Sequence, residues 1–243
     1  KKKWGLVDYH DNKSPAIFWG AYNKKDLKII LNHKSYGIML FAGNDLREDK
    51  TKKIFDRKRK TFFTSAYGWR SDLLNEYGIH PKKMILPVKD YSNLKPAPLG
   101  KCIYIYIGQP NNQRYEYFKY DEIIVPLIEH FGEKRVIWVK EKEPISFNDL
   151  VADYYTNSFI YIKPNERGGS TSMWDMGFMG RKTIANNQGN LPNVIGYKDL
   201  NHMIDLIYEE SNKIGTIQED IHHQTKQVFQ TTDEWLYLKF WLK

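Results

Sequence analysis

The chain contains 243 residues, of which 41% are hydrophobic and 27% are charged. This length suits one large domain or two small ones, and the apolar content is enough for a buried core, so disorder of the whole chain is excluded. No apolar run approaches the roughly 20 residues that a bilayer span needs. Cys102 is the single cysteine, which excludes an internal disulfide framework. We expect a protein of a reducing compartment, in the cytoplasm or peripheral to a membrane.

Positive charge is concentrated in the first part of the chain. The net formal charge is +8, and residues 1–95 hold 21 Lys+Arg and 10 Asp+Glu, whereas residues 96–243 hold 16 and 19. The densest basic segment, Arg47–Lys60, has eight basic and three acidic residues. Such a run is typical of a solvated amphipathic helix, with Ile54 and Phe55 turned inward. A basic half also suits nucleic acid, an anionic surface or a phosphate-bearing ligand.

Strand and helix patterns alternate along residues 1–95. Short β-prone apolar runs predict strands at Trp4–Tyr9, Ala16–Tyr22, Tyr36–Ala42, Thr61–Ser65 and Lys83–Val88. Helical spacing of apolar residues predicts helices at Lys25–His33, Arg47–Lys60 and Ser71–Tyr77. This alternation favours a parallel sheet covered by helices on both faces.

Residues 89–100 differ in composition from their surroundings. They contain Pro96, Pro98 and Gly100 and little apolar content, so this segment is the best candidate for a linker. We therefore predict a small N-terminal domain over residues 1–95 and a C-terminal domain over residues 96–243.

A second alternating series follows the linker. Its predicted strands are Lys101–Ile107, Arg135–Val139, Phe159–Ile162, Lys182–Ala185 and Val194–Gly196. Its predicted helices are Asp121–Phe131, Phe147–Tyr155, Thr171–Met179, Leu200–Ser211 and, approximately, Ile217–Leu242. The fold class is thus α/β, with two Rossmann-like parallel-sheet domains, of which the N-terminal one is reduced.

A glycine-rich turn follows the predicted strand Phe159–Ile162. In open parallel sheets, ligands bind at the carboxyl ends of strands, near helix N-termini. Gly168 and Gly169 let a ligand approach the backbone closely, and Ser170 or Thr171 can cap the next helix. Exposed amides at that helix start suit a diphosphate, although the same pattern also fits an ordinary strand–turn–helix junction.

Two charged side chains flank this turn. Arg167 can add a charge-assisted contact to a diphosphate. Asp175 lies in the first turns of the helix, where its carboxylate can reach a bound sugar or ribose.

The whole segment resembles the C-terminal nucleotide-sugar site of glycosyltransferases with the two-domain GT-B architecture. The family pattern is a strand, an acidic residue, a Gly-Gly or Gly-Ser turn, a helix carrying Glu, a glycine, and a strand of type G-x-P/K-x-I-A. The residues that match are Glu166, Gly168-Gly169-Ser170, Asp175, Gly180 and Arg181–Ala185. Asp175 stands where the family usually has Glu, which keeps the carboxylate but shortens its reach. The resemblance extends from Gly100 to the end of the chain and implies two domains that face a cleft.

The resemblance also implies roles for individual residues. Glu166 would lie near the donor sugar, the amides of Ser170 and Thr171 would hold the diphosphate, and Asp175 would hold the donor ribose. Gly108 follows the first strand of the donor domain, and Lys140 lies where the nucleotide base is usually held.

Two further features fit the same family. Arg114 or Lys119 would supply the basic side chain that often meets the diphosphate. The ending Glu234–Trp241 resembles the terminal helix that crosses back onto the N-terminal domain.

Transfer of a sugar needs a stabilised diphosphate leaving group and, for inversion, a base on the acceptor hydroxyl. Asp45, at the carboxyl end of a predicted strand, is the first candidate, and His10 with Asp11 comes second. Each of them also suits a turn or cap. Together with Glu166, Asp45 and His10 form the predicted catalytic set, and the histidines and carboxylates show no metal-ligand spacing.

The leading hypothesis is a metal-independent glycosyltransferase that needs no cofactor beyond its nucleotide-diphosphate sugar, with UDP or GDP as carrier. Its acceptor would be a glycan, glycoprotein or glycolipid, and Arg47–Lys60 would contact an anionic surface; no stable nucleic acid partner is expected. The alternative is a noncatalytic Rossmann-like module that binds nucleic acid or an anionic polymer through its basic half. A third hypothesis is another α/β enzyme that holds a phosphate in the glycine turn, such as a sugar-phosphate epimerase. The motifs G-x-G-x-x-G after an early strand, G-x-x-x-x-G-K-[ST] and G-x-S-x-G are absent from the sequence.

Overall fold

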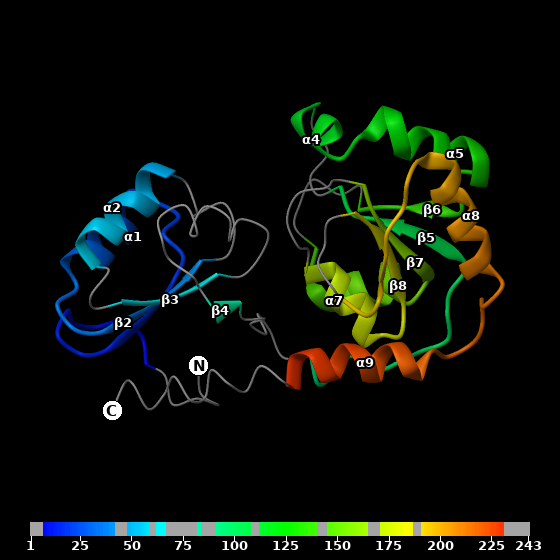
Figure 1. Ribbon diagram of the computed structural model, residues 1–243. Coiled ribbons are helices and arrows are strands. Elements are labelled where there is room, and N and C mark those ends of the chain that lie inside the picture. The colour runs from blue at the N-terminus through cyan, green and yellow to red at the C-terminus, as the bar shows by residue number, and fades with distance from the viewer. Residues whose placement is uncertain are drawn as a thin grey trace. The chain divides into compact units, whose positions relative to one another are not determined.

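The chain divides into two compact units, one assigned Lys1–Leu86 and Phe229–Lys243 and the other Pro87–Val228. In the computed structural model each unit has its own parallel sheet (Figure 1). The structure describes residues 7–41, 48–58, 62–66, 82–83, 91–107, 112–139, 145–164, 171–186 and 191–230. The division lies a few residues before the domain boundary predicted at residue 95.

The sheet of the first unit has four parallel strands in the order β1-β2-β3-β4. These strands are β1 (Ala16–Trp19), β2 (Gly37–Phe41), β3 (Phe62–Ala66) and β4 (Lys82–Lys83). β1 and β2 lie within runs predicted as strands, β3 extends one residue beyond the predicted run Thr61–Ser65, and β4 shares only Lys83 with the predicted strand Lys83–Val88. Residues 7–9, the described part of the predicted strand Trp4–Tyr9, belong to no strand. The predicted helix Ser71–Tyr77 lies outside the described residues.

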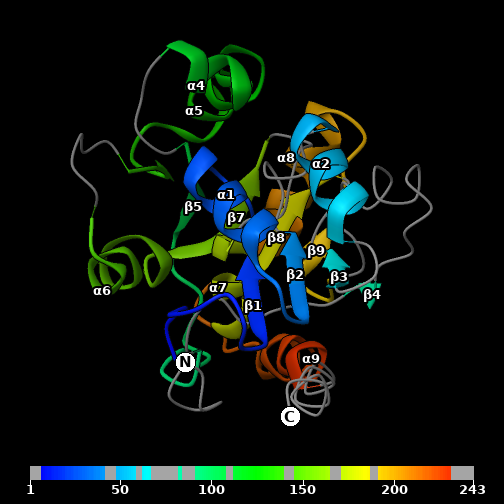
Figure 2. The same ribbon diagram turned by 90° about the vertical axis from the view of Figure 1, so that its left-hand side faces the viewer.

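Two helices of this unit, α1 (Lys24–Asn32) and α2 (Glu48–Lys58), lie on the same side of the sheet (Figure 2). Right-handed crossovers that advance in one direction along a sheet place their helices on one face. The two helices share an apolar core with the first strands, made of Phe18, Ala21, Ile30, Met39 and Ile54. The prediction of helices on both faces is therefore not met by the described helices of this unit.

The start of α1 is fixed by a capping box. The amide of Asp26 donates to the side-chain oxygen of Asn23 at 2.9 Å, and the amide of Asn23 donates to the Asp26 carboxylate at 3.3 Å. This reciprocal pair satisfies two amides that have no partner within the helix, so the helix begins at Lys24.

The sheet of the second unit has five parallel strands in the order β6-β5-β7-β8-β9. The strands are β5 (Cys102–Ile105), β6 (Val136–Ile137), β7 (Ser158–Lys163), β8 (Lys182–Ala185) and β9 (Val194–Ile195). Each coincides with a predicted strand, so the parallel α/β fold of this half is confirmed.

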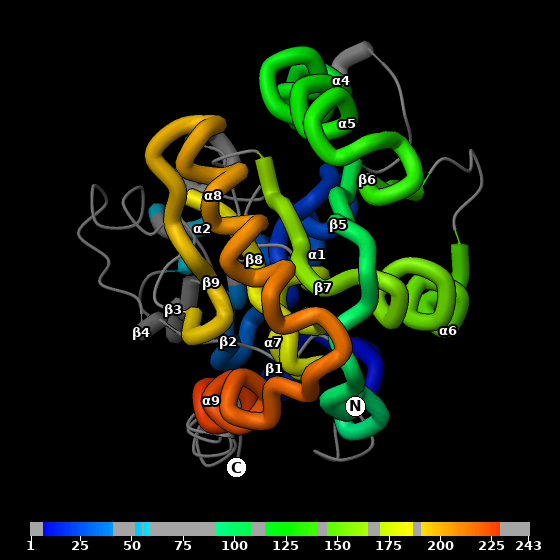
Figure 3. Tube along the Cα trace, turned by 90° about the vertical axis from the view of Figure 1, so that its right-hand side faces the viewer, coloured from blue at the N-terminus to red at the C-terminus, as the bar shows by residue number. Residues whose placement is uncertain are grey.

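Helices cover both faces of this sheet. They are α4 (Asn112–Tyr117), the π-helical turn η2 (Tyr120–Ile124), α5 (Val125–Phe131), α6 (Phe147–Asp149), the π-helical turn η3 (Leu150–Tyr155), α7 (Thr171–Phe178), α8 (Leu200–Ser211) and α9 (Glu219–Gln230). Helices α5 and α8 lie on one face of the sheet (Figure 3). Ile103 and Ile105 share an apolar core with η2, α5 and α8. The opposite face carries Tyr104, whose ring contacts Tyr155 of η3. Alternation along β5 thus separates an aliphatic layer from an aromatic one.

The segment predicted as a linker packs on the second unit instead. The Leu99 amide donates to the Thr216 carbonyl at 2.9 Å, and the Gly100 amide donates to the Ser158 carbonyl at 3.1 Å. The Tyr91 ring stacks on the Phe178 ring at a centroid distance of 4.6 Å. Its few apolar side chains are buried, so composition alone misjudged this segment.

The end of the chain was predicted as one long helix to Leu242. Helix α9 is described as far as Gln230. The predicted crossing of the terminal helix onto the N-terminal domain falls on residues 231–243, outside the described residues.

Candidate functional site

The strand order of the second unit places a topological switch point between β5 and β7. The chain runs from β5 to β6 on one side and then crosses back to β7 on the other. Ligands of open parallel sheets bind outside the carboxyl ends of the strands at this point. Here those ends are Ile105 and Lys163. Gly108 and the glycine turn follow these two strands in the sequence and lie outside the described residues.

Most of the predicted site residues lie outside the described part of the chain. These are Asp45, Gly108, Lys140, Glu166, Arg167, Gly168, Gly169 and Ser170. The backbone of Arg114 lies in α4, and nothing is described of its side chain. The described site residues are Thr171, Asp175 and His10, together with Lys119, which directly precedes η2.

Thr171 is the first residue of α7 and is exposed at the helix start. The helix ends at Phe178, and two residues later comes Gly180, which matches the glycine of the family pattern. Its φ of +76° lies in the left-handed region, and a Cβ there would stand 2.7 Å from the Gln218 carbonyl oxygen. A side chain is therefore excluded by both conformation and space.

Asp175 is buried, with 1% of its surface exposed. The Tyr155 hydroxyl lies 3.1 Å from Asp175 Oδ2 and 3.0 Å from the Ser172 hydroxyl. The Asp175 carboxylate thus ties α7 to η3. Burial, followed by the negative charge of Asp175, raises the pKa of Tyr155 well above its usual value. The predicted ribose contact of Asp175 stays a prediction, and its tyrosine partner could not be predicted from the sequence.

A layer of tyrosine rings lies on the same face of the sheet. The ring of Tyr104 is 5.3 Å from that of Tyr155 and 5.4 Å from that of Tyr161. Burial and the neighbouring tyrosines raise the pKa of Tyr104 well above its usual value, so its hydroxyl stays protonated. Among the described residues, that hydroxyl has no hydrogen-bond partner.

Lys163 is a buried cation at the switch point. It ends β7, with 3% of its surface exposed, and burial lowers the pKa of its ammonium group to about 8. Sequence reasoning gave this residue no role. The available signal was a lysine that ends the otherwise uncharged strand SFIYIK, directly before Pro164.

Arg181 donates hydrogen bonds to backbone carbonyls of several segments of the second unit. Its buried guanidinium donates to the carbonyls of Ser158 at 2.8 Å, Met179 at 2.7 Å, Pro98 at 3.1 Å and Thr156 at 3.3 Å. Burial lowers the pKa of Arg181 to about 10. The residue matched the family pattern by position, and its contacts join the start of β7 to the end of α7 and to the segment before β5.

His10 lies in the first unit, before the amino end of β1. Its Nε2 is 2.9 Å from Asp11 Oδ2, and its side chain is exposed. Asp11 accepts from the amides of Lys13 and Ser14, both at 2.6 Å, and these bonds lower the pKa of Asp11 to about 2. The pair was expected to follow a strand, but it precedes one. The catalytic role of His10 stays a prediction.

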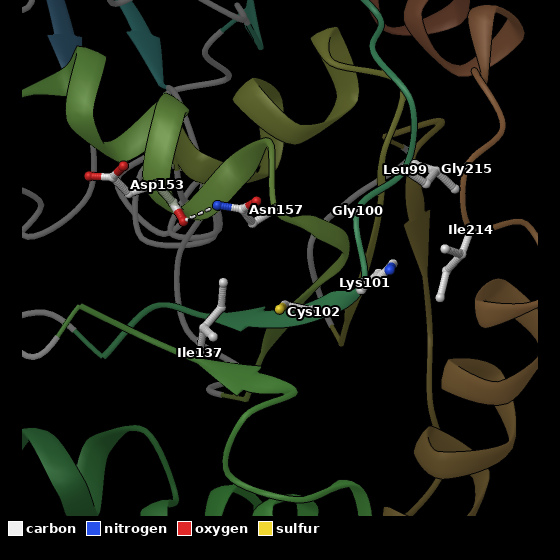
Figure 4. A pocket seen from close by; sticks show the side chains of 9 residues that line it. All are labelled: Leu99, Gly100, Lys101, Cys102, Ile137, Asp153, Asn157, Ile214 and Gly215. Atoms are coloured by element: carbon white, nitrogen blue, oxygen red, sulfur yellow. Dashed lines mark hydrogen bonds between the residues drawn. The ribbon is translucent and has the colours of Figure 1, made fainter.

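A pocket of about 520 Å³ lies at the opposite, amino end of the second sheet (Figure 4). Its lining includes Cys102, Asp153 and Asn157, and the Asn157 side chain donates to the Asp153 carbonyl at 2.9 Å. Burial raises the pKa of the Cys102 thiol. Since ligands of parallel sheets bind at the carboxyl ends, this pocket is not the predicted donor site.

Within the described ranges, no three His, Cys, Asp or Glu side chains are grouped so as to hold a metal ion. Nor does any helix among the same residues have the length and apolar character to cross a bilayer.

No family model and no curated protein matches this sequence. Among solved structures, the chain is similar to the DNA-modifying enzyme β-glucosyltransferase, with 13% identity, a TM-score of 0.50, and coverage of 90% of this chain and 79% of that one. It is also similar to AviGT4, a glycosyltransferase involved in avilamycin A biosynthesis, with 9% identity, a TM-score of 0.45, and coverage of 93% and 96%.

A third similar structure is a sucrose-phosphate synthase from Thermosynechococcus elongatus, with 12% identity and a TM-score of 0.47. The match covers 90% of this chain, which spans 60% of the length of that one. The resemblance to GT-B glycosyltransferases is thus confirmed at the level of the fold. The chain is an α/β protein with two Rossmann-like parallel-sheet units.

Proposed function

We propose that this protein is a glycosyltransferase that moves a sugar from a nucleotide-diphosphate sugar to a hydroxyl acceptor. The observation that carries the proposal is the switch point between β5 and β7, to which the sequence attaches a Gly-Gly-Ser turn and a helix. The β-glucosyltransferase that shares the fold has uridine diphosphoglucose as its substrate. UDP and its sugars are therefore the first donors to try, followed by GDP and its sugars.

The proposed donor site combines the amides at the start of α7 with nearby positive charge. Ser170 and Thr171 would hold the diphosphate, and Glu166 and Asp175 would contact the donor sugar and ribose. Gly108, Arg114, Arg167 and Lys140 would complete the nucleotide site, as they do by position in the family pattern.

We add Lys163 to this set. Lys163 ends β7, and ligands of this fold bind at the carboxyl ends of the strands, so its ammonium group would pair with the diphosphate. With a pKa of about 8, the free protein loses this charge as the pH rises through 8. Diphosphate affinity should therefore fall above that pH.

The first unit would bind the acceptor, with Asp45 as the general base and His10 as the second candidate. Neither a metal nor a further cofactor is part of the proposal. Arg47–Lys60 would contact an anionic surface.

The test is a thermal-shift and calorimetric titration with UDP, GDP, dTDP, CMP and their sugars, at 50 and 300 mM salt. A salt-tolerant rise in melting temperature with one nucleotide supports the transferase and names its donor class. Lys163→Met should weaken that binding at least tenfold, because it removes a positive charge next to the diphosphate. Glu166→Gln should weaken binding of the nucleotide sugar but not of the nucleotide alone, because Glu166 would contact the sugar.

Lys134→Met is the matched control, since Lys134 is an exposed lysine of the same unit before β6. It should bind the nucleotide as the wild type does. Equal loss in Lys134→Met and Lys163→Met would remove Lys163 from the site.

The alternative of a noncatalytic polyanion-binding module rests on the basic first unit. It predicts no response to any nucleotide and a steep loss of polyanion binding with salt. That combination of results would replace the transferase proposal.

A further inference from the structure

The turn after β1 presents two exposed aromatic rings at the carboxyl edge of the first sheet. Trp19, the last residue of β1, is 42% exposed, and Tyr22 is 50% exposed. Large rings are usually buried, so two exposed rings three residues apart on one turn call for an explanation.

The backbone of this turn is held in place. Gly20 has a φ of +74°, and its amide donates to the Leu40 carbonyl of β2 at 2.9 Å. Ala21 is completely buried in the core of the unit. The Tyr22 amide donates to the Asp26 carboxylate at 3.1 Å, so the turn is joined to the first turn of α1. The rings therefore extend from a rigid support, which lowers the entropy that a ligand must overcome.

Positive charge follows the rings directly in the sequence. Lys24 and Lys25 are the first two residues of α1 and are both exposed. The carboxylate of Asp26, the next residue, accepts a hydrogen bond from the Asn23 amide in the capping box. The positive end of the helix dipole adds to the field at this place.

We propose that Trp19, Tyr22, Lys24 and Lys25 form the acceptor subsite and that the acceptor is an acidic glycan. This inference rests on the proposed transferase function, because it names the acceptor class for the basic unit. Aromatic faces pack against the C–H faces of sugar rings, and the ammonium groups pair with carboxylate, sulfate or phosphate substituents. The carboxyl edge of a parallel sheet is the edge where ligands bind.

Nucleic acid fits these observations less well. Proteins that bind single strands stack successive bases on several rings along a basic groove. Within the described residues of the first unit, the other large apolar side chains that are exposed are Val7, Tyr9 and Tyr36, which come before β1 or β2 at the opposite edge. Two rings on one turn match one or two sugar units.

The experiment measures glycan binding by the full chain without any donor. An array of acidic oligosaccharides, including tetragalacturonate, a hyaluronan tetrasaccharide and a sialylated trisaccharide, is compared with their neutral methyl-ester counterparts. Calorimetry then gives the affinity for the best acidic glycan. We expect it to bind at least tenfold more tightly than its ester, and Trp19→Ala and the double variant Lys24→Gln/Lys25→Gln each to weaken it about tenfold.

Matched controls come from the opposite edge of the same sheet. Tyr36→Ala removes a ring that is 65% exposed, and Lys13→Gln/Lys34→Gln removes two exposed charges. Both controls should bind the acidic glycan as the wild type does. Equal losses in the controls and in the variants of the turn would overturn the subsite. So would an array in which no acidic glycan exceeds its neutral counterpart.

Two further outcomes separate this inference from the proposed function. If a nucleotide binds the protein but no acidic glycan does, the subsite is wrong and the transferase stands. If acidic glycans bind through Trp19 and Lys24 but no nucleotide binds, the transferase is wrong and the site belongs to a glycan-binding protein. Tighter binding of an eight-nucleotide single-stranded DNA through the same residues would overturn the glycan assignment.

Discussion

The two units differ in how they bury polar groups. Among the described residues, the first unit buries one polar side chain, His33, whereas the second buries nine. Those of the second unit are Ser158, Lys163, Ser172, Asp175, Arg181, Thr183, Asn193, Glu210 and Thr225. A buried polar group is costly unless it is bonded, so each satisfied group selects one arrangement of the chain around it.

The difference suggests that the two units have different roles. In the second unit, the buried side chains of Arg181 and Asp175 form hydrogen bonds that join neighbouring elements of the described chain. The first unit has a small apolar core around Phe18 and Met39 and carries its distinctive residues on the surface. Substitutions inside the second unit should therefore cost stability, whereas surface changes in the first should alter binding alone.

The largest effect is expected for Arg181→Met. The change removes the guanidinium that donates hydrogen bonds to four carbonyls. The Ser158 carbonyl still accepts a hydrogen bond from the Gly100 amide. Carbonyls left without a donor cost about 1–3 kcal/mol each, so we expect a loss of about 3–5 kcal/mol in the free energy of unfolding. Hydrogen exchange in denaturant, followed peptide by peptide, measures this separately for the two units.

Arg135→Met is the control for this change, because Arg135 is exposed in the same unit. It should alter stability by less than about 0.5 kcal/mol. A small effect of Arg181→Met, equal to that of Arg135→Met, would mean that the buried hydrogen bonds do not distinguish the second unit.

Gly100→Ala tests the close packing of the segment before β5. A Cβ at Gly100 would lie 2.2 Å from the carbonyl carbon and oxygen of Asn157, so the backbone must shift. We expect a loss of about 2–3 kcal/mol in unfolding free energy.

Gly132→Ala is the comparison, because Gly132 has a φ of +85° but no atom within 4 Å of its Cβ position. Its ψ of 145° lies in a region that only glycine adopts readily, so backbone strain alone should cost about 1–3 kcal/mol there. A loss below about 0.5 kcal/mol in Gly100→Ala, measured by urea unfolding, would refute the steric argument.

Some features of the second unit could be predicted from the sequence and others could not. The buried strands were recognised because apolar β-prone runs such as KCIYIYI are visible without tertiary context. The strand order β6-β5-β7 could not be predicted in the same way, because it depends on which strands pair across the sheet. The predicted helix Asp121–Phe131 is divided into a π-helical turn and α5, and Pro126 near the start of α5 has no amide to donate.

The candidate site was predicted less completely than the fold. The pattern around Asp175 and Gly180 was found by resemblance, and Gly180 meets a conformational demand that a sequence can reveal. The partners of Asp175 and Arg181 could not be foreseen, because they are a tyrosine 20 positions away and carbonyls as far as 83 positions away. Lys163 was missed because a lysine at a strand end usually reaches solvent.

A pair of Tyr→Phe substitutions on one aromatic layer distinguishes satisfied from unsatisfied buried hydroxyls. Tyr155→Phe removes the partner of the Asp175 carboxylate and should destabilise the second unit by about 2 kcal/mol, as expected for a bond to a charged group. Tyr104→Phe removes a hydroxyl with no partner among the described residues, so stability should be unchanged or rise by up to about 1 kcal/mol.

Thermal unfolding of the two variants at pH 7.5 gives the answer. The pair also tests the role of Asp175: Tyr155→Phe should leave nucleotide affinity within twofold, whereas Asp175→Asn should weaken it if the carboxylate holds the ribose. Equal destabilisation by both Tyr→Phe changes would show that burial alone, not hydrogen bonding, governs this layer.

The smallest effect concerns the single buried polar side chain described in the first unit. Burial lowers the pKa of His33 below its usual 6.5. Its Nε2 lies 3.2 Å from the Tyr36 carbonyl and its Nδ1 lies 3.4 Å from the Tyr9 hydroxyl, an arrangement that suits the neutral ring, with Nδ1 as acceptor. The unfolded chain therefore binds the proton more readily than the folded one. The stability that His33 contributes is complete above pH 6.5, falls as the pH drops through 6.5, and levels off below the folded pKa.

Hydrogen exchange of peptides from α1 and β2 between pH 7.5 and 5.5, corrected for the intrinsic rate, should show this loss in the wild type. In His33→Gln, which cannot titrate, the profile should be flat. A parallel loss in both proteins would assign the pH dependence to other groups and leave the two units alike in this respect.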